Sequence, residues 1–205
     1  DERHEQFAAR GRQRVAITGA SGLIGTALTD FLRAGGHEVL RFVRRPPRAD
    51  DEIRWDPAER ELDASRLEGL DAIVNLAGEP VAERWTAAHK REIRDSRVNG
   101  TALIATTIAT LQRPPRVLVN GSAVGYYGDR GEELLDETSA PGTGFLPDTA
   151  RLWEAATEPA AARGTRVVLA RTGVVLSPRG GAVAKLLPPF RMGAGGRIGD
   201  GRQWM

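Results

Sequence analysis

The fold is decided by the stretch Arg14-Val-Ala-Ile-Thr-Gly-Ala-Ser-Gly-Leu-Ile-Gly25, in which a short apolar run leads into three evenly spaced glycines. Residues 15–18 have the composition of a buried strand. After the glycines, apolar pairs recur at helical spacing until Gly35-Gly36 stops the pattern. The stretch therefore predicts a strand, a tight turn and an amphipathic helix in direct succession.

Gly19, Gly22 and Gly25 indicate what this turn is for. The first glycine permits the tight turn, the second lets phosphates approach the backbone, and the third allows the helix to pack closely on the strand. The helix N-terminus, which attracts anions, then faces the ligand. The spacing is G-x-x-G-x-x-G rather than G-x-G-x-x-G, and a glycine triplet alone also fits an ordinary strand–turn–helix. The setting between strand and helix favours a pyrophosphate-binding turn.

A second expected strand, residues 38–43, ends at two arginines. In a dinucleotide-binding unit, the residue at this point reads the adenosine ribose. An acidic residue would accept hydrogen bonds from the free hydroxyls of NAD, whereas the guanidinium of Arg44 would pair with the 2′-phosphate of NADP. We therefore expect NADP(H) as the cofactor. Taken alone, Arg44 and Arg45 also fit a solvated loop that leads to Pro46-Pro47.

Composition excludes several other classes of protein. The chain has 205 residues, 40% of them hydrophobic, which is enough for one sizeable core. A formal net charge of +2, with acidic and basic residues interspersed, argues against a nucleic-acid partner. There is no cysteine and the three histidines are scattered, so we expect no metal site. Without an apolar run of about 20 residues or a signal-peptide pattern, we expect a soluble, cytoplasmic protein with no membrane partner.

Strand and helix patterns alternate along the rest of the chain. Further strands are expected at 53–56, 71–76, 116–120 and 166–171, with helical patterns over 86–111 and 148–163. This alternation predicts an α/β protein with a doubly wound parallel sheet, a Rossmann fold with strand order 3-2-1-4-5-6. We expect residues 14–205 to form one NADP-binding domain, preceded by a charged arm at residues 1–13.

Several motifs carry a family resemblance. Residues 18–25 (TGASGLIG), 75–78 (NLAG) and 121–128 (GSAVGYYG) resemble the extended short-chain dehydrogenase/reductase superfamily, in its NAD-dependent epimerase/dehydratase branch. Others narrow the resemblance to a subgroup named only "epimerase family protein", some of whose members were once labelled cell-division inhibitors. These are Trp55-Asp-Pro57, Arg84-Trp85, Ser96-Arg97, Trp153-Glu154, Arg171-Thr-Gly-Val-Val-Leu-Ser177 and Gly180-Gly181. Because subgroup members run on further, we expect the C-terminal substrate-side region to be truncated here.

The resemblance extends the expected cofactor site. It implies that the pyrophosphate is lined by Gly19, Ser21, Gly22, Leu23, Ile24 and Gly25, the 2′-phosphate by Arg44, and the adenosine side and bridging ribose by Leu76, Ala77 and Gly78. Glu92 and Arg97 on the following helix, and the backbone of Val175, complete the implied site. Glu92 also fits a solvated helix face. Arg97 stands where the wider family has an asparagine, so it could reach the cofactor or the substrate.

The resemblance also implies a proton-transfer site, and here the chain departs from the superfamily. The usual machinery is a Ser or Thr after the fifth strand and a Tyr-x-x-x-Lys pair on the fifth helix. Ser122 matches the first. Counting back from Trp153-Glu154 puts Ala150 at the lysine position and Leu146, or Phe145 by a one-residue slip, at the tyrosine position. None of these apolar side chains can transfer a proton.

Two nearby tyrosines are candidates for a relocated acid. Tyr127 is slightly favoured over Tyr126, because the superfamily's own tyrosine before the loop glycine aligns with it. Both also fit a pocket wall or packing against Trp153. Glu79 is a further candidate acid, although it also fits a backbone hydrogen-bonding role at the turn before Pro80.

Two functions follow. The first is an NADP(H)-dependent oxidoreductase, or an epimerase-like enzyme, acting on an unidentified small molecule with a carbonyl or hydroxyl group. The alternative is a non-catalytic NADP(H)-binding sensor or regulatory protein. Basic residues near the C-terminus would meet an anionic substrate such as a nucleotide sugar, or are surface charge; they are Arg179, Lys185, Arg191 and Arg197. The resemblance is also compatible with a homodimer.

Overall fold

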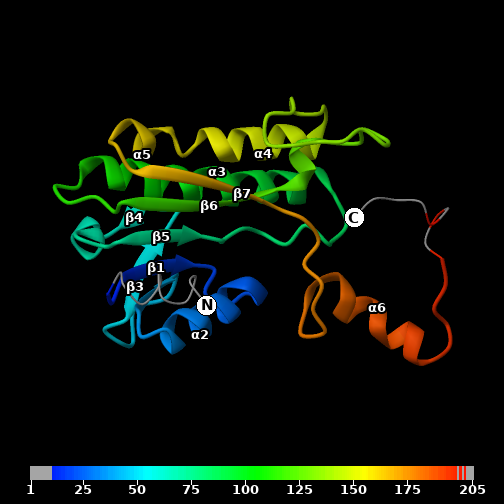
Figure 1. Cartoon of the computed structure of the whole chain (residues 1–205), viewed down its shortest axis with the longest axis horizontal. Coiled ribbons are helices and arrows are strands. Elements are labelled where there is room, and N and C mark those ends of the chain that lie inside the picture. Colours follow the sequence, from blue (N-terminus) through cyan, green and yellow to red (C-terminus); the bar gives the residue numbers. More distant parts are fainter. Residues whose placement is uncertain (1–10, 198, 200, 202–205) are drawn as a thin grey trace.

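A seven-stranded sheet forms the centre of the fold (Figure 1). The computed structural model describes residues 11–197, 199 and 201. The strands are β1 (Arg14–Thr18), β2 (Glu38–Val43), β3 (Glu52–Asp56), β4 (Glu61–Leu62), β5 (Ala72–Asn75), β6 (Val117–Ala123) and β7 (Arg166–Thr172). They lie in the order β4-β3-β2-β1-β5-β6-β7, with all neighbours parallel except β3 and β4. The expected order 3-2-1-4-5-6 is confirmed, and β4 is an unpredicted antiparallel edge ribbon.

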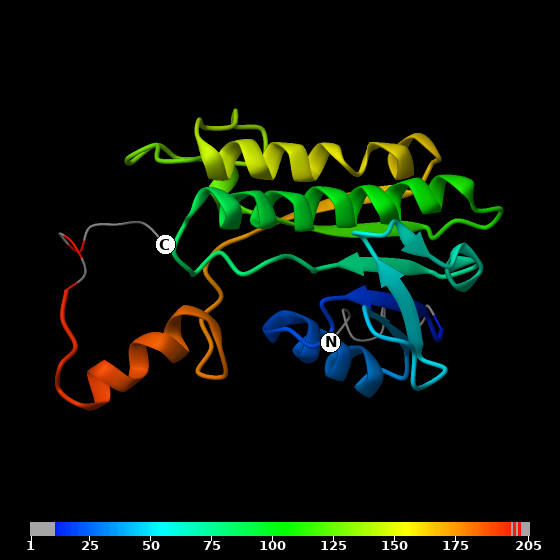
Figure 2. The same cartoon turned by 180° about the vertical axis from the view of Figure 1, so that it is seen from behind.

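Helices cover both faces of the sheet (Figures 1 and 2). On one face lies α2 (Leu23–Ala34), and on the other α3 (Ala87–Thr110), α4 (Phe145–Ala155) and α5 (Glu158–Ala162) lie together. The larger core cluster, which includes Trp55, Ile104 and Leu118, lies on the α3 side. A smaller cluster around Ile17 lies under α2. The remaining elements are the 3-10 turns η1 (Ala64–Leu67) and η2 (Val124–Tyr126), and α6 (Gly181–Arg191), which extends beyond the carboxyl ends of the strands.

Two expected elements differ from the structure by more than one residue at an end. The single helix expected over 148–163 is two helices, α4 and α5. Pro159 accounts for the break, because proline lacks an N–H and its ring clashes with the carbonyl four residues earlier, so that it is favoured in the first turn of a new helix, where it lies in α5. The strand expected over 116–120 continues as β6 to Ala123, because its pairing with β7 continues to Thr172. Ser122 therefore lies within a strand and not on the loop after it.

The expected charged arm falls mainly on residues 1–10, which lie outside the described residues. In the part of the chain that the structure describes, no helix is both long enough and apolar enough to cross a membrane. The described residues also bring together no group of three or more His, Cys, Asp or Glu side chains that could hold a metal ion.

Candidate functional site

The glycine turn joins β1 to α2 as the sequence predicts. Gly19 has a φ of +65°, in the left-handed region that favours glycine, and its carbonyl accepts a hydrogen bond from the Gly22 amide at 2.9 Å. A Cβ on Gly25 would lie 2.1 Å from the Gly19 carbonyl oxygen, which no real side chain tolerates. These two constraints keep the turn tight and let α2 begin directly after Gly22.

The N-terminus of α2 is open to a ligand. Gly22 is the N-cap residue, it offers no capping side chain, and the first turn contains no acidic residue. The first amides of a helix have no partner within it, so those of Leu23 and Ile24 can bond an anion. Ser21 and Gly22 are exposed. Bare backbone donors, with no capping side chain and no acidic residue in the first turn of α2, fit a dinucleotide pyrophosphate.

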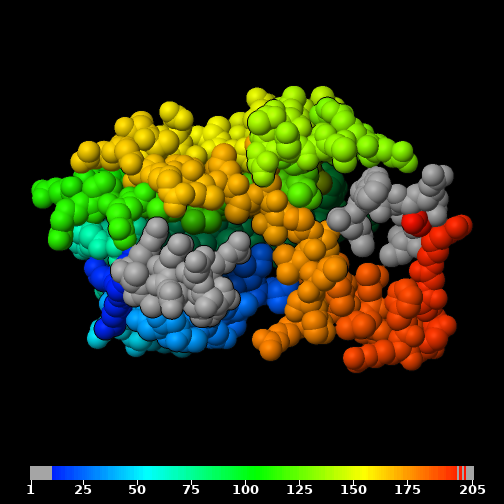
Figure 3. Space-filling view, viewed as in Figure 1, coloured from blue at the N-terminus to red at the C-terminus, as the bar shows by residue number. Residues whose placement is uncertain are grey.

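A groove of about 880 Å³ runs along this end of α2. One wall is the turn and α2, and the other is the segment after β7; Figure 3 shows the blue and orange surfaces of these segments next to each other. The groove is lined by five predicted cofactor residues and by one of the basic residues considered for an anionic substrate: Ser21, Gly22, Leu23, Ile24 and Val175, and Arg179. The fold therefore brings Val175 from the far end of the chain to the glycine turn.

A buried row of polar side chains crosses the sheet beside the turn. Thr18, Asn75 and Asn120 are neighbours in register on β1, β5 and β6, and each is at most 2% exposed. Asn75 accepts a hydrogen bond from the Thr18 hydroxyl at 2.6 Å and donates one to Asn120 at 2.7 Å. The Thr18 hydroxyl accepts from the amides of Leu76 and Ala77, at 2.9 and 3.1 Å. This row fixes the loop on which the expected adenosine-side residues lie.

Helices α3 and α4 complete the row. The hydroxyl of Thr101 accepts from Asn75 Nδ2 and from Trp153 Nε1, each at 2.8 Å, and donates to Asn120 Oδ1 at 3.2 Å. Neither Thr101 nor Asn120 was predicted from the sequence. A polar residue at the end of the expected strand 116–120 was the available signal for Asn120. Thr101 lies within a helix pattern, which gives no such signal.

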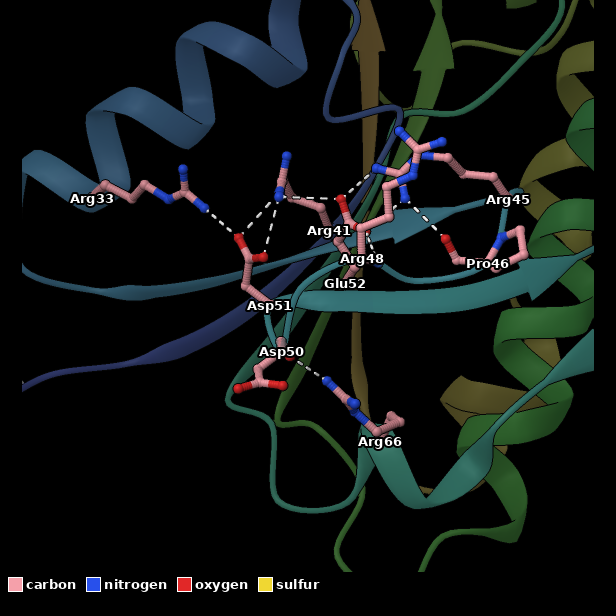
Figure 4. A network of polar contacts seen from close by, with 9 residues as sticks. All are labelled: Arg33, Arg41, Arg45, Pro46, Arg48, Asp50, Asp51, Glu52 and Arg66. Atoms are coloured by element: carbon pink, nitrogen blue, oxygen red, sulfur yellow. Dashed lines mark hydrogen bonds and ion pairs between the residues drawn. The ribbon is translucent and has the colours of Figure 1, made fainter.

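The two arginines after β2 have different surroundings. Arg45 donates to both carboxylate oxygens of Glu52, at 2.6 and 2.8 Å, and Arg41 contacts the same carboxylate at 3.3 Å (Figure 4). Hydrogen bonds from Arg45 and from the Arg48 amide lower the pKa of Glu52 to about 2. Arg44 is exposed and makes no hydrogen bond or ion pair with the residues that the structure describes. Of these two arginines, Arg44 is therefore the one whose guanidinium has no partner among the described residues.

Of the two candidates on α3, Arg97 lies against the predicted loop. Its guanidinium covers Gly78, where a Cβ would be 3.0 Å from Arg97 Cζ, and it donates to the Glu79 carbonyl at 2.9 Å. Burial lowers the pKa of Arg97, and the charge of Glu79 opposes this effect. Glu92 is exposed, with its carboxylate 3.3 Å from Nδ1 of His89. The structure thus brings Arg97, but not Glu92, to the loop, and a cofactor contact by Glu92 stays a prediction.

The three candidate catalytic residues gather at the carboxyl ends of β6 and β7. Ser122 donates to Oε1 of Glu154 at 2.6 Å. Glu154 accepts from Nε and Nη2 of Arg171, at 2.8 and 2.9 Å. Arg171 donates to the Tyr127 hydroxyl at 3.0 Å, and its Cζ lies 3.6 Å from the centroid of the Tyr126 ring. Glu154 and Arg171, which the sequence analysis gave no catalytic role, therefore connect all three candidates.

The usual Tyr-x-x-x-Lys position on α4 is apolar, as the sequence indicates. Ala150 is 4% exposed. Phe145 packs edge-on against Trp85, with ring centroids 5.4 Å apart. Leu146 lies beside Gly125 of η2. None of these side chains can donate a proton, whereas the cluster around Ser122 contains the hydroxyls of Tyr126 and Tyr127.

The chain matches the NAD dependent epimerase/dehydratase family over residues 15–205. Epimerase family protein Mb2239 of Mycobacterium bovis is 49% identical over 192 residues, which cover 93% of this chain and 63% of that protein. Epimerase family protein SDR39U1 of Homo sapiens is 41% identical over 195 residues, covering 93% and 64%. The chain thus spans less than two thirds of the length of these relatives.

Solved structures agree with this match. The nucleoside-diphosphate sugar epimerase from Corynebacterium glutamicum is 41% identical, with a TM-score of 0.84 over 98% of this chain and 43% of that one. Human SDR39U1 isoform 2, solved with NADPH, is 39% identical, with a TM-score of 0.82 over 93% of this chain and 63% of that one. With its glycine turn, its strand order and these similarities, the chain belongs to the NAD dependent epimerase/dehydratase family and is similar to the proteins named epimerase family protein.

Proposed function

We propose that the protein binds NADP(H) and uses it to oxidise or reduce a small molecule at a carbonyl or hydroxyl carbon, or to epimerise it through a transient oxidation. The observation that carries the proposal is that the open glycine turn and the Ser122–Tyr127 cluster both lie at the carboxyl ends of the parallel strands. Ligands of doubly wound sheets bind at that edge. The relative solved with NADPH supports the choice of coenzyme.

Different groups of the protein would bind the different parts of the dinucleotide. The amides of Leu23 and Ile24 would bond the pyrophosphate, because they are the free donors at the start of α2. Arg44 would pair with the 2′-phosphate, since Arg45 is already held by Glu52. Val175 would line the groove farther along. A bound nicotinamide would supply or accept the hydride.

In the proposed reaction, the proton that reaches the substrate oxygen comes from a protein side chain. Tyr127 has its hydroxyl 3.0 Å from Arg171, and Ser122 is 5% exposed with its proton directed to Glu154. Tyr127 would donate a proton to the substrate oxygen during reduction, and the Ser122 lone pairs would accept a hydrogen bond from the hydroxyl group of the alcohol form. Tyr126, whose ring stacks on Arg171, would support the site as its wall.

A carbonyl panel tests this function. The chain is mixed with NADPH and a series of aldehydes, ketones and keto sugars, and the loss of nicotinamide absorbance is followed. We expect turnover with at least one compound, and a fall in kcat of about 10²-fold or more for Tyr127→Phe. Ser122→Ala is expected to act in the same direction, and Tyr126→Phe to act much less. Equal loss in both tyrosine variants would contradict the assignment of Tyr127.

A second candidate function is a non-catalytic NADP(H) sensor. The observation that favours it is Ala150, which stands buried where the superfamily has its lysine. Tight binding of NADPH together with no turnover on any member of the panel would support the sensor and contradict the enzyme. Binding of NADPH with turnover that depends on Tyr127 would do the reverse.

A further inference from the structure

Strand register and helix packing bring the Ser122 cluster together. β6 and β7 are parallel, and their register pairs Ser122 with Arg171 on the face that α4 covers. Glu154 projects from α4 onto this pair and bonds both residues. Glu154 is 9% exposed, and the side chain of Arg171 is 16% exposed. The contact between carboxylate and guanidinium is bidentate, the geometry that holds an arginine most firmly.

The hydrogen bonds in this cluster have only one possible direction. A guanidinium has donors and no acceptor, so Tyr127 must accept from Arg171 with an oxygen lone pair. The phenolic proton of Tyr127 is therefore directed away from Arg171 and remains available to a third group. In the same way, an ionised carboxylate can only accept, so the proton of Ser122 points at Glu154.

The charge state of Glu154 supports this reading. Burial favours the neutral acid, but hydrogen bonds from Arg171 and Ser122 outweigh burial and lower the pKa of Glu154 overall. The hydrogen bond to Glu154 likewise raises the pKa of Arg171, although burial opposes it. The pair is therefore an ion pair at neutral pH, and Arg171 keeps the positive charge that it presents to Tyr127.

We propose that Glu154 and Arg171 are positioning residues that take over the role of the absent lysine: Glu154 holds Arg171, and Arg171 holds Tyr127 with its proton free for the substrate oxygen. The inference rests on the proposed function. A carbonyl carbon that receives hydride from a reduced nicotinamide leaves an electron pair on its oxygen. Tyr127 gives its proton to that oxygen, the resulting phenolate faces the Arg171 guanidinium, and solvent returns the proton to Tyr127.

The first test reads the hydrogen bond of Tyr127 and needs neither cofactor nor substrate. The chain has two tyrosines, so in the Tyr126→Phe variant the tyrosine doublet of the Raman spectrum reports Tyr127 alone. The intensity ratio of this doublet separates a phenol that accepts a hydrogen bond from one that donates. In the Tyr126→Phe parent we expect the ratio of a phenol that accepts a hydrogen bond. Adding Arg171→Met should shift the ratio toward that of a phenol that donates, and Arg171→Lys should restore part of the original ratio.

A variant in which both members of the ion pair are neutral serves as the control for misfolding. Arg171→Met alone leaves a buried carboxylate unpaired, which can prevent folding, so Glu154→Gln with Arg171→Met is made as well. The glutamine still accepts from Ser122, and the Raman shift is expected to be the same. Arg166→Met, on an exposed residue at the other end of β7, is the matched control and should leave the ratio unchanged. A donating ratio in the parent, or no shift in the neutral-pair variant, would overturn the proposal.

The second test separates positioning from binding. With a carbonyl that the wild-type chain reduces, the neutral-pair variant should lose about 10²-fold in kcat, with the NADPH dissociation constant unchanged. Adding Tyr127→Phe should cause little further loss, because all three changes act through one hydroxyl. Additive losses would overturn the proposal. If the wild-type chain reduces no carbonyl, the proposed function fails, and the Raman ratio still decides whether Arg171 positions Tyr127.

Discussion

The two arginines after β2 differ in whether their guanidinium groups are available to a dinucleotide. Arg45 is held by Glu52 at 2.6 Å, whereas Arg44 is exposed without a partner among the described residues. We predict that Arg44→Ala weakens NADPH binding about tenfold or more, since a charge-assisted hydrogen bond contributes about 1.5–3 kcal/mol. NADH binding should not change. Arg45→Ala is the matched control; an equal loss of NADPH affinity in that variant would contradict the assignment.

Glycine substitutions in the turn separate folding from binding. A Cβ at position 25 would lie 2.1 Å from the Gly19 carbonyl oxygen, whereas one at the exposed Gly22 would lie 3.2 Å from that atom. Gly25→Ala should therefore lower the free energy of unfolding by about 3 kcal/mol or more. Gly22→Ala should cost less than about 1 kcal/mol and still weaken NADPH binding, because the methyl group stands where phosphates approach. Urea unfolding measures the stability and calorimetry measures the binding of NADPH. A Gly25→Ala chain as stable as the wild type would contradict the packing argument.

Residues in local patterns were predictable, and residues whose partners come from elsewhere were not. The glycines were proposed from spacing along one strand–turn–helix, Arg44 from its place after the next strand, and Ser122 from a motif. Glu52, Glu154 and Arg171 gain their roles only from contacts across the fold: Arg171 meets Glu154 on α4 and Tyr127 after η2. A sequence pattern carries no information on such pairs until strand register is known, so the cluster that connects Ser122 to Tyr127 went unseen.

At the scale of elements, the buried polar row ties three strands and two helices together. Asn75 alone bonds Thr18, Thr101 and Asn120. We predict that Asn75→Ala lowers the free energy of unfolding by about 2–4 kcal/mol, because it leaves several buried polar groups without a partner. Thr106→Ala, on the exposed side of α3, is the control and should change stability by less than about 0.5 kcal/mol. Equal urea midpoints for the two variants would show that the row does not hold the elements together.

Strands and helices with strong periodicity were predicted well, and their ends less so. α3 runs from Ala87 to Thr110, within one residue of the expected 86–111 at each end, because Thr86 caps it and Leu111 leaves the helix. The break between α4 and α5 depends on Pro159, whose effect on a helix depends on whether it falls in a first turn. The length of β6 depends on its partner β7, which a single-strand pattern cannot show.

For the whole molecule, buried carboxylates predict sensitivity to acid. The pKa of Glu52 falls from 4.5 to about 2 in the folded chain, so its ionised form stabilises the fold above about pH 4.5 and this stabilisation is lost as the pH falls toward 2. We predict that the free energy of unfolding decreases over this range, and that Glu52→Gln is less stable at neutral pH and loses less on acidification. Glu59→Gln, at an exposed position, is the control. Identical acid profiles for Glu52→Gln and wild type would contradict the role of Glu52.

We propose that one edge of the sheet holds a nicotinamide dinucleotide and prefers the phosphorylated form. Calorimetric titration of the wild-type chain with NADPH and with NADH tests it most directly. The open start of α2 predicts that both bind. Arg44, which has no partner among the described residues, predicts a dissociation constant for NADPH that is lower by about tenfold or more. Equal constants for the two coenzymes, or no heat of binding with either, would contradict the claim.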